Sequence, residues 1–274
     1  MEYAQEHGIK VSPPTFGQST ANTRIDVENL SIYKGLYSIK YMNAEVPEQL
    51  FALAGTLNGA EPFTDVLTRI KTETSCDSRQ LEILIKLDFF RKYGNATELI
   101  AINWYHELLG FGAKRSVKKE KIMMSPLPDF IGEYATDVGR NGKELKQWNI
   151  HDCPGLLNRC VRFVKESNMH EPTYEQKCKW QQEFLGYVDL TTGKPEDRKK
   201  LFITDIHPLR SKKDNAIWAY ALFTRSIGTG KCGRFTIRNW IYQLEPIKKE
   251  DIIQVLDYHN ERGYWYLDEY EIVV

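Results

Sequence analysis

The sequence predicts an α+β protein in which a helical half precedes a small five-stranded β-barrel. Up to Leu185, apolar residues recur mainly at helical spacing, and capping residues mark several helix starts. From Gly186 onward, β-branched and aromatic residues dominate five short runs that are separated by turn residues. The length agrees with this division, because 274 residues can bury one large core or two small ones.

The most strongly marked helical segment is residues 77–109, where we predict two amphipathic helices joined by a short basic turn. Asp77 and Asn95 each have a Gln or Glu three residues later, which is the spacing of a capping box. The turn, Arg91–Asn95, holds two cations and a glycine. Free backbone N–H groups and cations at such a turn suit a phosphate, so Arg91, Lys92, Gly94 and Asn95 are candidate contacts. The alternative is an ordinary helical hairpin with a solvated tip.

A similar pair of helices is predicted upstream. Apolar residues of Ile32–Ile39 and Ala44–Ala54 have helical spacing, and the turn Lys40–Asn43 lies between them. A further helix is predicted at Val66–Ile70, after a turn that ends with Pro62. The sequence therefore predicts two helix-turn-helix units in tandem between residues 32 and 109.

The remaining parts of the first 185 residues have weaker signals. Glu2–His7 is expected to form a short helix, and Pro13-Pro14 imposes an extended path. Residues 110–185 are interrupted by glycine and proline, with helices expected at Leu156–Val164 and Tyr174–Leu185. We interpret this region as a helical connector.

The C-terminal part is predicted to be a Greek-key barrel, because its runs are short, aromatic and separated by turns. The expected strands are Leu201–Ile206, Ile217–Ile227, Gly233–Leu244, Asp251–Tyr258 and Tyr264–Val274. Basic residues on such strands can follow a nucleic-acid backbone, and aromatic residues can stack on bases. The candidate contacts for a single strand are Arg225, Lys231, Arg234, Arg238 and Trp240.

The distribution of charge along the chain is more informative than the net charge. The chain has 37 basic and 37 acidic residues, so its net charge does not indicate a nucleic-acid partner. Basic residues nevertheless gather in three places beside turns and aromatic strands, which favours a phosphate-binding surface. The clusters are Lys114, Arg115, Lys118, Lys119 and Lys121, then Arg198–Lys200, then Arg225, Lys231, Arg234 and Arg238.

Composition disfavours several classes of protein. No apolar run approaches the ~20 residues that a membrane-spanning helix needs, and we recognise no secretory signal, so we expect no membrane partner. Five cysteines without a CxxC pattern favour reduced thiols and a cytoplasmic location.

We expect no cofactor and no metal. Gly228–Lys231 lacks the first glycine that a phosphate-binding GxxxxGK loop requires, and a strand-to-strand turn explains it better. His151, Cys153 and Cys160 lack a fourth ligand at a standard zinc spacing.

The order of these parts resembles the C-terminal half of the alpha subunit of bacterial DNA polymerase III, the C-family replicative polymerase. HGIKVSPP is similar to the end of that family's fingers. IYKGLYSIKYMNAEV and SRQLEILIKLDFFRKYGNATEL resemble its two helix-hairpin-helix motifs. LGYVDLTTGKP and IKKEDIIQVLDYHNERGYWYLDEYEIV resemble the OB-fold region of divergent members.

The resemblance implies four parts. They are a leading segment at 1–30 like the end of the fingers, a tandem helix-hairpin-helix domain at 31–112, a helical connector at 113–185 and an OB-like barrel at 186–274. It also implies duplex DNA at the hairpin tips, where Lys40 and Asn43 join the contacts, and single-stranded DNA on the barrel.

This chain departs from the family in two ways. The family's first hairpin usually has a Gly-x-Gly turn where this chain has Tyr41-Met42-Asn43, which weakens the case for Lys40 and Asn43. No Asp-x-Asp pair occurs, and the palm carboxylates that hold magnesium in the family are expected upstream of Met1. We therefore expect no catalysis from this chain by itself.

Three hypotheses follow. The first is a non-catalytic DNA-binding protein, either a split or a detached homologue of the polymerase. The second is a subunit that completes an active DNA-directed DNA polymerase with a separate upstream chain. The third is a protein-interaction module of the replication machinery, and a sliding clamp is one partner to consider, with Gln147–Ile150 as a faint candidate for its peptide.

Overall fold

The computed structural model describes residues 7–110, 112–123 and 127–273. The chain forms two compact units that divide between Pro172 and Thr173, and each unit is described by itself. Most of the helix expected at Glu2–His7 lies outside the described residues. The unit boundary falls inside the region expected to be a connector.

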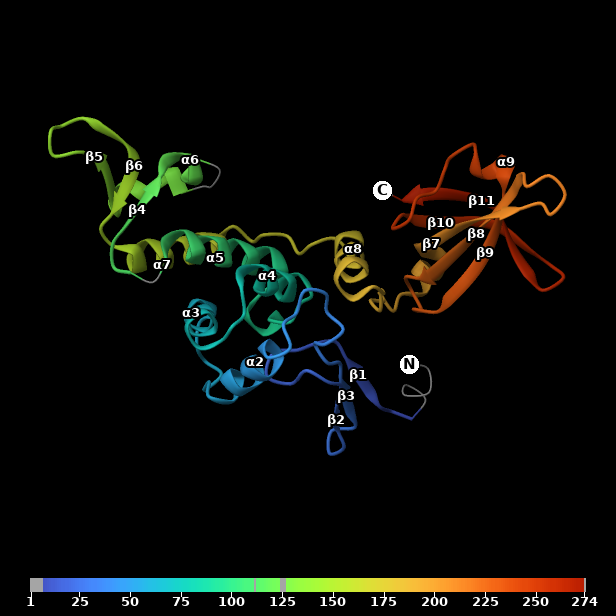
Figure 1. The fold of residues 1–274 in the computed structure, drawn as a ribbon, viewed down its shortest axis with the longest axis horizontal. Helices are drawn as coiled ribbons and strands as arrows, with labels where there is room; N and C mark the ends of the chain where they lie inside the picture. Colours follow the sequence, from blue (N-terminus) through green and yellow to red (C-terminus); the bar gives the residue numbers. More distant parts are fainter. Residues whose placement is uncertain (1–6, 111, 124–126, 274) are drawn as a thin grey trace. The chain divides into compact units, whose positions relative to one another are not determined.

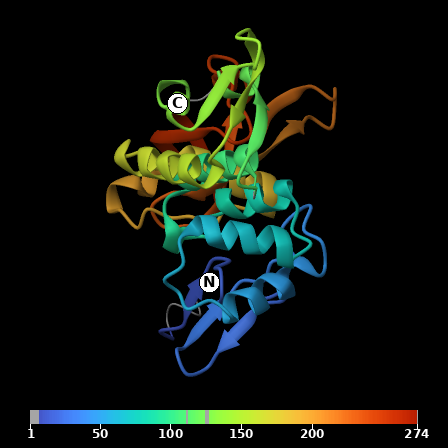
Figure 2. The ribbon, with the colours of Figure 1, turned by 90° about the vertical axis from the view of Figure 1, so that its left-hand side faces the viewer.

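The first unit begins with a small sheet of three short strands, β1 (Lys10–Ser12), β2 (Arg24–Asp26) and β3 (Ser31–Tyr33). β3 lies in the middle, parallel to β1 and antiparallel to β2. Figures 1 and 2 show this sheet at one end of the helical part of the unit.

The helix expected at Ile32–Ile39 is not formed. Ile32 belongs to β3, and residues 36–41 form a series of turns. The N–H groups of Leu36 and Tyr37 donate to the carbonyls of Thr20 and Ala21, both at 3.0 Å. These N–H groups bond to carbonyls of another segment instead of to carbonyls of a helix. The segment is therefore not helical, although its apolar residues have helical spacing.

The other predicted helices of this half are present. They are α2 (Val46–Gly55), α3 (Phe63–Glu73), α4 (Ser78–Lys86) and α5 (Ala96–Leu109), with the short 3-10 helix η1 (Arg91–Tyr93) between the last two. Both capping boxes are formed, by Asp77 with Gln80 and by Asn95 with Glu98. Because each box satisfies two backbone N–H donors at a helix start, α4 and α5 begin where the sequence predicts.

The residues that follow α5 contain a sheet that the expected helical connector did not include. Its strands are β4 (Arg115–Lys118), β5 (Ala135–Val138) and β6 (Glu144–Ile150), in the order β4-β6-β5, and all pairs are antiparallel. Three short helices, α6 (Lys119–Ile122), η2 (Leu127–Asp129) and η3 (Ile131–Glu133), lie between β4 and β5. α7 (Cys153–Glu166) then packs along α5. Short strands without clear alternation give little sequence signal.

The second unit starts with α8 (Tyr174–Leu185) and η4 (Pro195–Lys199) and continues as a closed five-stranded barrel. The strands are β7 (Lys200–Arg210), β8 (Ile217–Ser226), β9 (Cys232–Arg238), β10 (Ile252–Glu261) and β11 (Tyr264–Val273). Their order is β7-β8-β9-β11-β10, and β10 pairs back to β7. β9 and β11 are parallel, and a short helix, α9 (Asn239–Tyr242), precedes β10. This mixed Greek-key arrangement is OB-like and confirms the predicted barrel.

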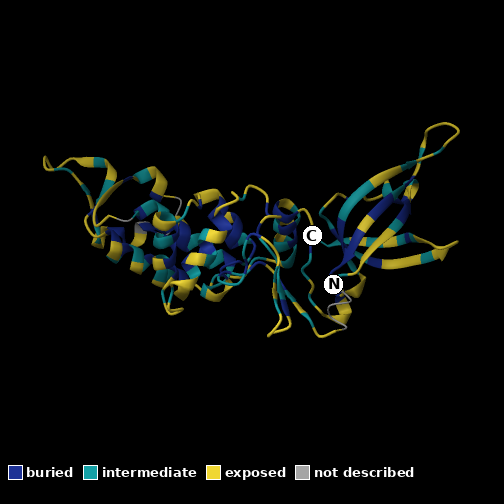
Figure 3. Cartoon of the chain, turned by 60° about the horizontal axis from the view of Figure 1, so that its bottom comes forward, coloured by how far each residue is buried: buried dark blue, intermediate teal, exposed yellow. Residues whose placement is uncertain are grey.

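Both units have a substantial apolar core, which Figure 3 shows as dark blue segments inside the helices and strands. The barrel encloses Leu201, Ile203, Leu222, Ile237, Ile253, Val255 and Leu267, while Cys178 of α8 packs with Phe202, Ile227 and Ile252. Within the described residues, no helix is both long enough and apolar enough to cross a membrane.

The five cysteines are all free thiols, and four of them are buried. Burial raises the pKa of Cys76, Cys160 and Cys178 to about 12. These three thiols are therefore protonated and unreactive near neutral pH, since the thiolate is the reactive form.

One buried histidine makes the first unit sensitive to acid. The Nε2 of His106 on α5 lies 2.9 Å from the hydroxyl of Thr68 on α3, and that hydroxyl donates to the carbonyl of Thr64. Nε2 therefore carries the proton. Burial, with a smaller contribution from the charge of Lys71, lowers the pKa of His106 from 6.5 to about 4.

We predict that this histidine destabilises the first unit as the pH falls from 6.5 to 4. The unfolded chain takes up the proton near pH 6.5, whereas the folded chain resists it. The free energy of unfolding should fall by at most about 3 kcal/mol over that range. Urea unfolding of the wild type and of His106→Gln at several pH values measures the effect. Equal pH slopes in the two proteins would contradict it.

Candidate nucleic-acid interface

A cluster of aromatic rings lies beneath the basic turn Arg91–Asn95. Phe90 contacts Phe16, Phe63 and Phe89, with ring centroids 4.9–5.5 Å apart. The N–H of Phe16 donates to the carbonyl of Phe89 at 2.9 Å, and Tyr93 contacts Phe63 with ring centroids at 5.4 Å. The turn is therefore supported from below by three separate segments of the chain.

Gly94 ends η1 with φ 155° and ψ −178°, a conformation that other residues rarely adopt. A Cβ at this position would lie 2.7 Å from Oε2 of Glu98 and 3.3 Å from Cδ2 of Leu99. The N–H of Gly94 donates to the carbonyl of Arg91. The glycine is thus required by the path of the backbone, and its N–H is already bonded.

Two of the predicted phosphate contacts are held by the segment after α7. Arg91 forms a two-pronged ion pair with Glu171, at 2.5 and 3.0 Å, and this bond raises the pKa of Arg91. Asn95 accepts a hydrogen bond from the N–H of Glu98, and its amide donates to the carbonyl of Met169 at 3.1 Å. A carboxylate thus lies where the sequence leads us to expect a phosphate.

Lys92 differs from Arg91, because no described carboxylate pairs with it. Its side chain is exposed at the turn, and Nζ lies 5.1 Å from the ring centre of Phe16 and 4.8 Å from that of Tyr93. These rings restrict the lysine stem while leaving its charge accessible.

The first predicted hairpin tip, Lys40–Asn43, follows a series of turns rather than a helix, so the first of the two expected helix-turn-helix units is not formed. The turn itself, called the first tip below, has an unusual backbone without glycine. Tyr41 has φ 66°, and its ring carries the guanidinium of Arg79 at 3.5 Å from the centroid. Gln80 donates to the carbonyl of Tyr41 at 2.9 Å. Lys40 and Asn43 are exposed on either side, and Arg79 adds a cation that the sequence patterns did not single out.

The barrel residues proposed for a single strand divide into three groups. Arg225 is only 9% exposed, with Nη1 3.9 Å from Sγ of Cys232, and the turn at Gly230 covers it. This corrects the expected exposure of Arg225. Trp240 is 64% exposed but lies on α9, because the strand expected to reach Leu244 ends at Arg238.

The third group consists of Arg238, which lies beside an aromatic ring at the surface, and of Lys231 and Arg234, which line a pocket. The guanidinium of Arg238 lies 5.9 Å from the ring centre of Tyr266, which stacks on His259. Lys231 and Arg234 line a pocket of about 300 Å³ in the barrel wall.

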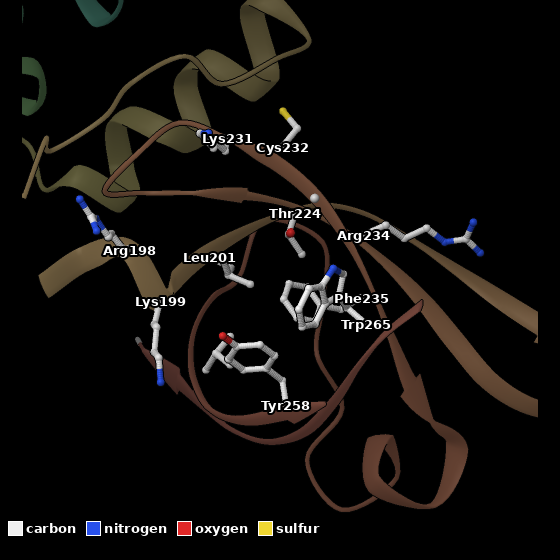
Figure 4. Close-up of a pocket in the computed structure, with 12 residues that line it drawn as sticks. Arg198, Lys199, Leu201, Thr224, Lys231, Cys232, Arg234, Phe235, Tyr258 and Trp265 are labelled. Carbon is white, nitrogen blue, oxygen red and sulfur yellow. The ribbon is translucent and has the colours of Figure 1, made fainter. Parts of the chain in front are cut away.

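The pocket is basic at its rim and aromatic inside (Figure 4). Its twelve lining residues are Arg198, Lys199, Leu201, Thr224, Lys231, Cys232, Gly233, Arg234, Phe235, Val255, Tyr258 and Trp265. None of them is acidic. Tyr258 contacts Phe235 and Trp265, with ring centroids 6.1 and 5.5 Å apart. The arrangement combines a cationic rim with faces on which a base can stack.

The sequence patterns did not single out Tyr258 and Trp265 of the pocket or Glu171, the partner of Arg91. Tyr258 and Trp265 lie on the two strands that flank the turn Arg262-Gly263, and strand alternation across a predicted hairpin could have placed them on one face. Glu171 has no such signal, because it lies 80 residues from Arg91 in the sequence.

The fold and the site define a helix-hairpin-helix region followed by a closed OB-like barrel, a combination in which DNA binding is the function that the motif indicates. In agreement, a family model described as a helix-hairpin-helix motif matches residues 8–98. The match runs from just before β1 into the first turn of α5 and includes the turn Lys40–Asn43 and the turn between α4 and α5. No curated protein matched this sequence.

We predict that Gly94→Ala destabilises the first unit by roughly 1–3 kcal/mol, because the new Cβ meets Glu98 and the backbone remains in a disfavoured region. Thermal or urea unfolding measures the loss. Gly55→Ala is the matched control, since nothing lies within 4 Å of a Cβ at the end of α2. A similar stability for both variants would contradict the role given to Gly94.

Proposed function

We propose that this protein binds DNA on two surfaces without reading its sequence. Duplex DNA contacts the two hairpin tips, and single-stranded DNA crosses the barrel at the basic pocket. The observation that carries the proposal is the occurrence, in one chain, of a helix-hairpin-helix motif at 8–98 and an OB-like barrel with a cationic, aromatic pocket.

The contacts at the tips are suited to phosphates rather than to bases. Lys92, Lys40 and Arg79 present exposed cations on short turns or at a helix start, where they can reach a backbone but not a groove floor. Arg91 can join them when a phosphate displaces Glu171. Position along the duplex is then set by backbone geometry alone.

The resemblance to the C-family polymerase supports a more specific proposal. The chain acts as the non-catalytic, DNA-holding counterpart of that enzyme's C-terminal part. Within the described residues, no group of three His, Cys, Asp or Glu side chains is placed to hold a metal ion. A second candidate is a subunit that completes an active polymerase with a separate chain carrying metal-binding carboxylates, and primer extension by the reconstituted pair would test it.

A protein partner is the remaining candidate, favoured by the neutral net charge and by the ion pair that occupies Arg91. The segment Gln147–Ile150, considered for a clamp, lies in β6, the middle strand of its sheet. It would have to leave both neighbouring strands to bind as an extended peptide. Clamp binding through this segment therefore has no structural support.

We expect affinity for a duplex to fall steeply with salt. Each phosphate contact should contribute about −0.9 to the slope of log K against log salt, so the three exposed cations at the tips, Lys40, Arg79 and Lys92, predict a slope near −3. Fluorescence anisotropy with a labelled duplex measures it. The double variant Lys40→Ala/Lys92→Ala should reduce the slope by about 2 units. A flat salt dependence in the wild type would refute duplex binding.

We also predict that Glu171→Gln strengthens duplex binding by up to about fivefold, since an exposed ion pair that competes for Arg91 is worth up to ~1 kcal/mol. The salt slope should become steeper by about 0.9, which corresponds to one further phosphate contact. The same anisotropy assay measures both quantities.

Glu166→Gln is the matched control for this prediction. It removes the same charge from the end of α7 but leaves Arg91 paired with Glu171. Equal effects of the two substitutions would show that only net charge matters, and the specific role of the Arg91–Glu171 pair would be abandoned.

A further inference from the structure

We propose that the barrel pocket binds one unstacked nucleotide, with the base inserted among the aromatic rings and the phosphate at the cationic rim. This inference rests on the proposed single-strand binding and makes it more specific. It distinguishes a site that takes a base inside the barrel wall from a flat surface over which a strand merely passes.

The pocket separates charge from apolar surface, as a nucleotide requires. Figure 4 shows Phe235, Trp265 and Tyr258 around the interior, with Arg198, Lys199 and Lys231 at the edge. The Lys199 ammonium lies 5.8 Å from the ring centre of Tyr258. A base among the rings therefore has positive charge beside it, where its own phosphate would lie.

The volume of the pocket limits the occupant. About 300 Å³ lies at the lower end of the roughly 300–1,000 Å³ typical of small-molecule sites. That space is large enough for a single base with part of its sugar. A base that enters it leaves the stack of its own strand, and contacts with the aromatic rings replace the lost stacking.

A polar group inside the pocket gives the base edge a partner. Thr224 is 2% exposed as a residue, and its side chain lines the pocket near Phe235 (Figure 4). Within the described part of the chain, its hydroxyl has no hydrogen-bond partner. Because a hydroxyl can donate and accept, it can pair with an edge of any base, which predicts little sequence preference.

Gly233 keeps this interior open. It pairs with Thr224 across the β8–β9 ladder, and a Cβ at Gly233 would lie 3.4 Å from Oγ1 of Thr224. A larger side chain at this position would occupy the space assigned to the base while leaving every cation in place. Gly233→Leu is therefore a blocking variant that separates base insertion from charge attraction.

The test compares a single-stranded oligonucleotide of about 12 nucleotides, within the site size of OB folds, with an abasic deoxyribose-phosphate strand of equal length and charge. The full chain should bind the base-bearing strand about tenfold more tightly, since one stacked base contributes roughly 1–3 kcal/mol. Gly233→Leu should lower its affinity to that of the abasic strand. The affinity for the abasic strand should not change.

Two exposed tryptophans, one inside the pocket and one outside it, show whether the oligonucleotide binds at the pocket. Trp265 lines the pocket and is 47% exposed, whereas Trp218 on β8 lies outside it and is 48% exposed. Quenching of tryptophan fluorescence by the oligonucleotide should persist in Trp218→Ala and be largely lost in Trp265→Ala. Both variants should keep the wild-type unfolding temperature to within a few degrees.

The outcomes separate this inference from the proposed function. Equal binding of base-bearing and abasic strands would overturn the inference and leave single-strand binding intact. Failure of the wild type to bind either strand would overturn both. Free deoxynucleoside monophosphates serve as a further probe. If they bind as tightly as the oligonucleotide, the source of the nucleotide is a free molecule rather than a strand.

Discussion

The packing of Phe90 beneath the second hairpin tip is the interaction on which the first unit depends. It joins Phe16 from the leading segment, Phe63 from α3 and Phe89 from the turn that follows α4. Because these rings are buried and come from distant segments, removing one would release several elements together. The same packing holds the tip in place, so the position of the tip is stabilised by the aromatic core rather than by contacts within the turn.

The contacts of the tip show why a basic turn is not equivalent to a free phosphate site. Arg91 and Asn95 already have partners in the segment that ends the first unit, and the N–H of Gly94 is bonded within the turn. In the proposed complex with a duplex, a phosphate must therefore compete with Glu171 for Arg91. The proposal accordingly assigns the main phosphate contacts to Lys92 and to the cations of the first tip.

The barrel assigns different environments to residues that are close together in the sequence. Arg225 and Lys231 are both cations near the β8–β9 turn, yet Arg225 is covered by the turn while Lys231 lines the pocket. Tyr258 of β10 contacts both Phe235 of β9 and Trp265 of β11. The pocket is therefore a product of barrel closure, because residues from all five strands line it.

The sequence by itself determined the elements whose signals are local. Capping boxes marked α4 and α5, and β-branched and aromatic runs marked all five barrel strands, because hydrogen bonds and side-chain period act over a few residues. Only the tertiary structure decided that residues 36–41 are not helical, that Glu171 pairs with Arg91, and that three aromatic rings line one pocket. Each of these depends on contacts between different segments of the chain, and the free energy of such contacts leaves no local pattern in the sequence.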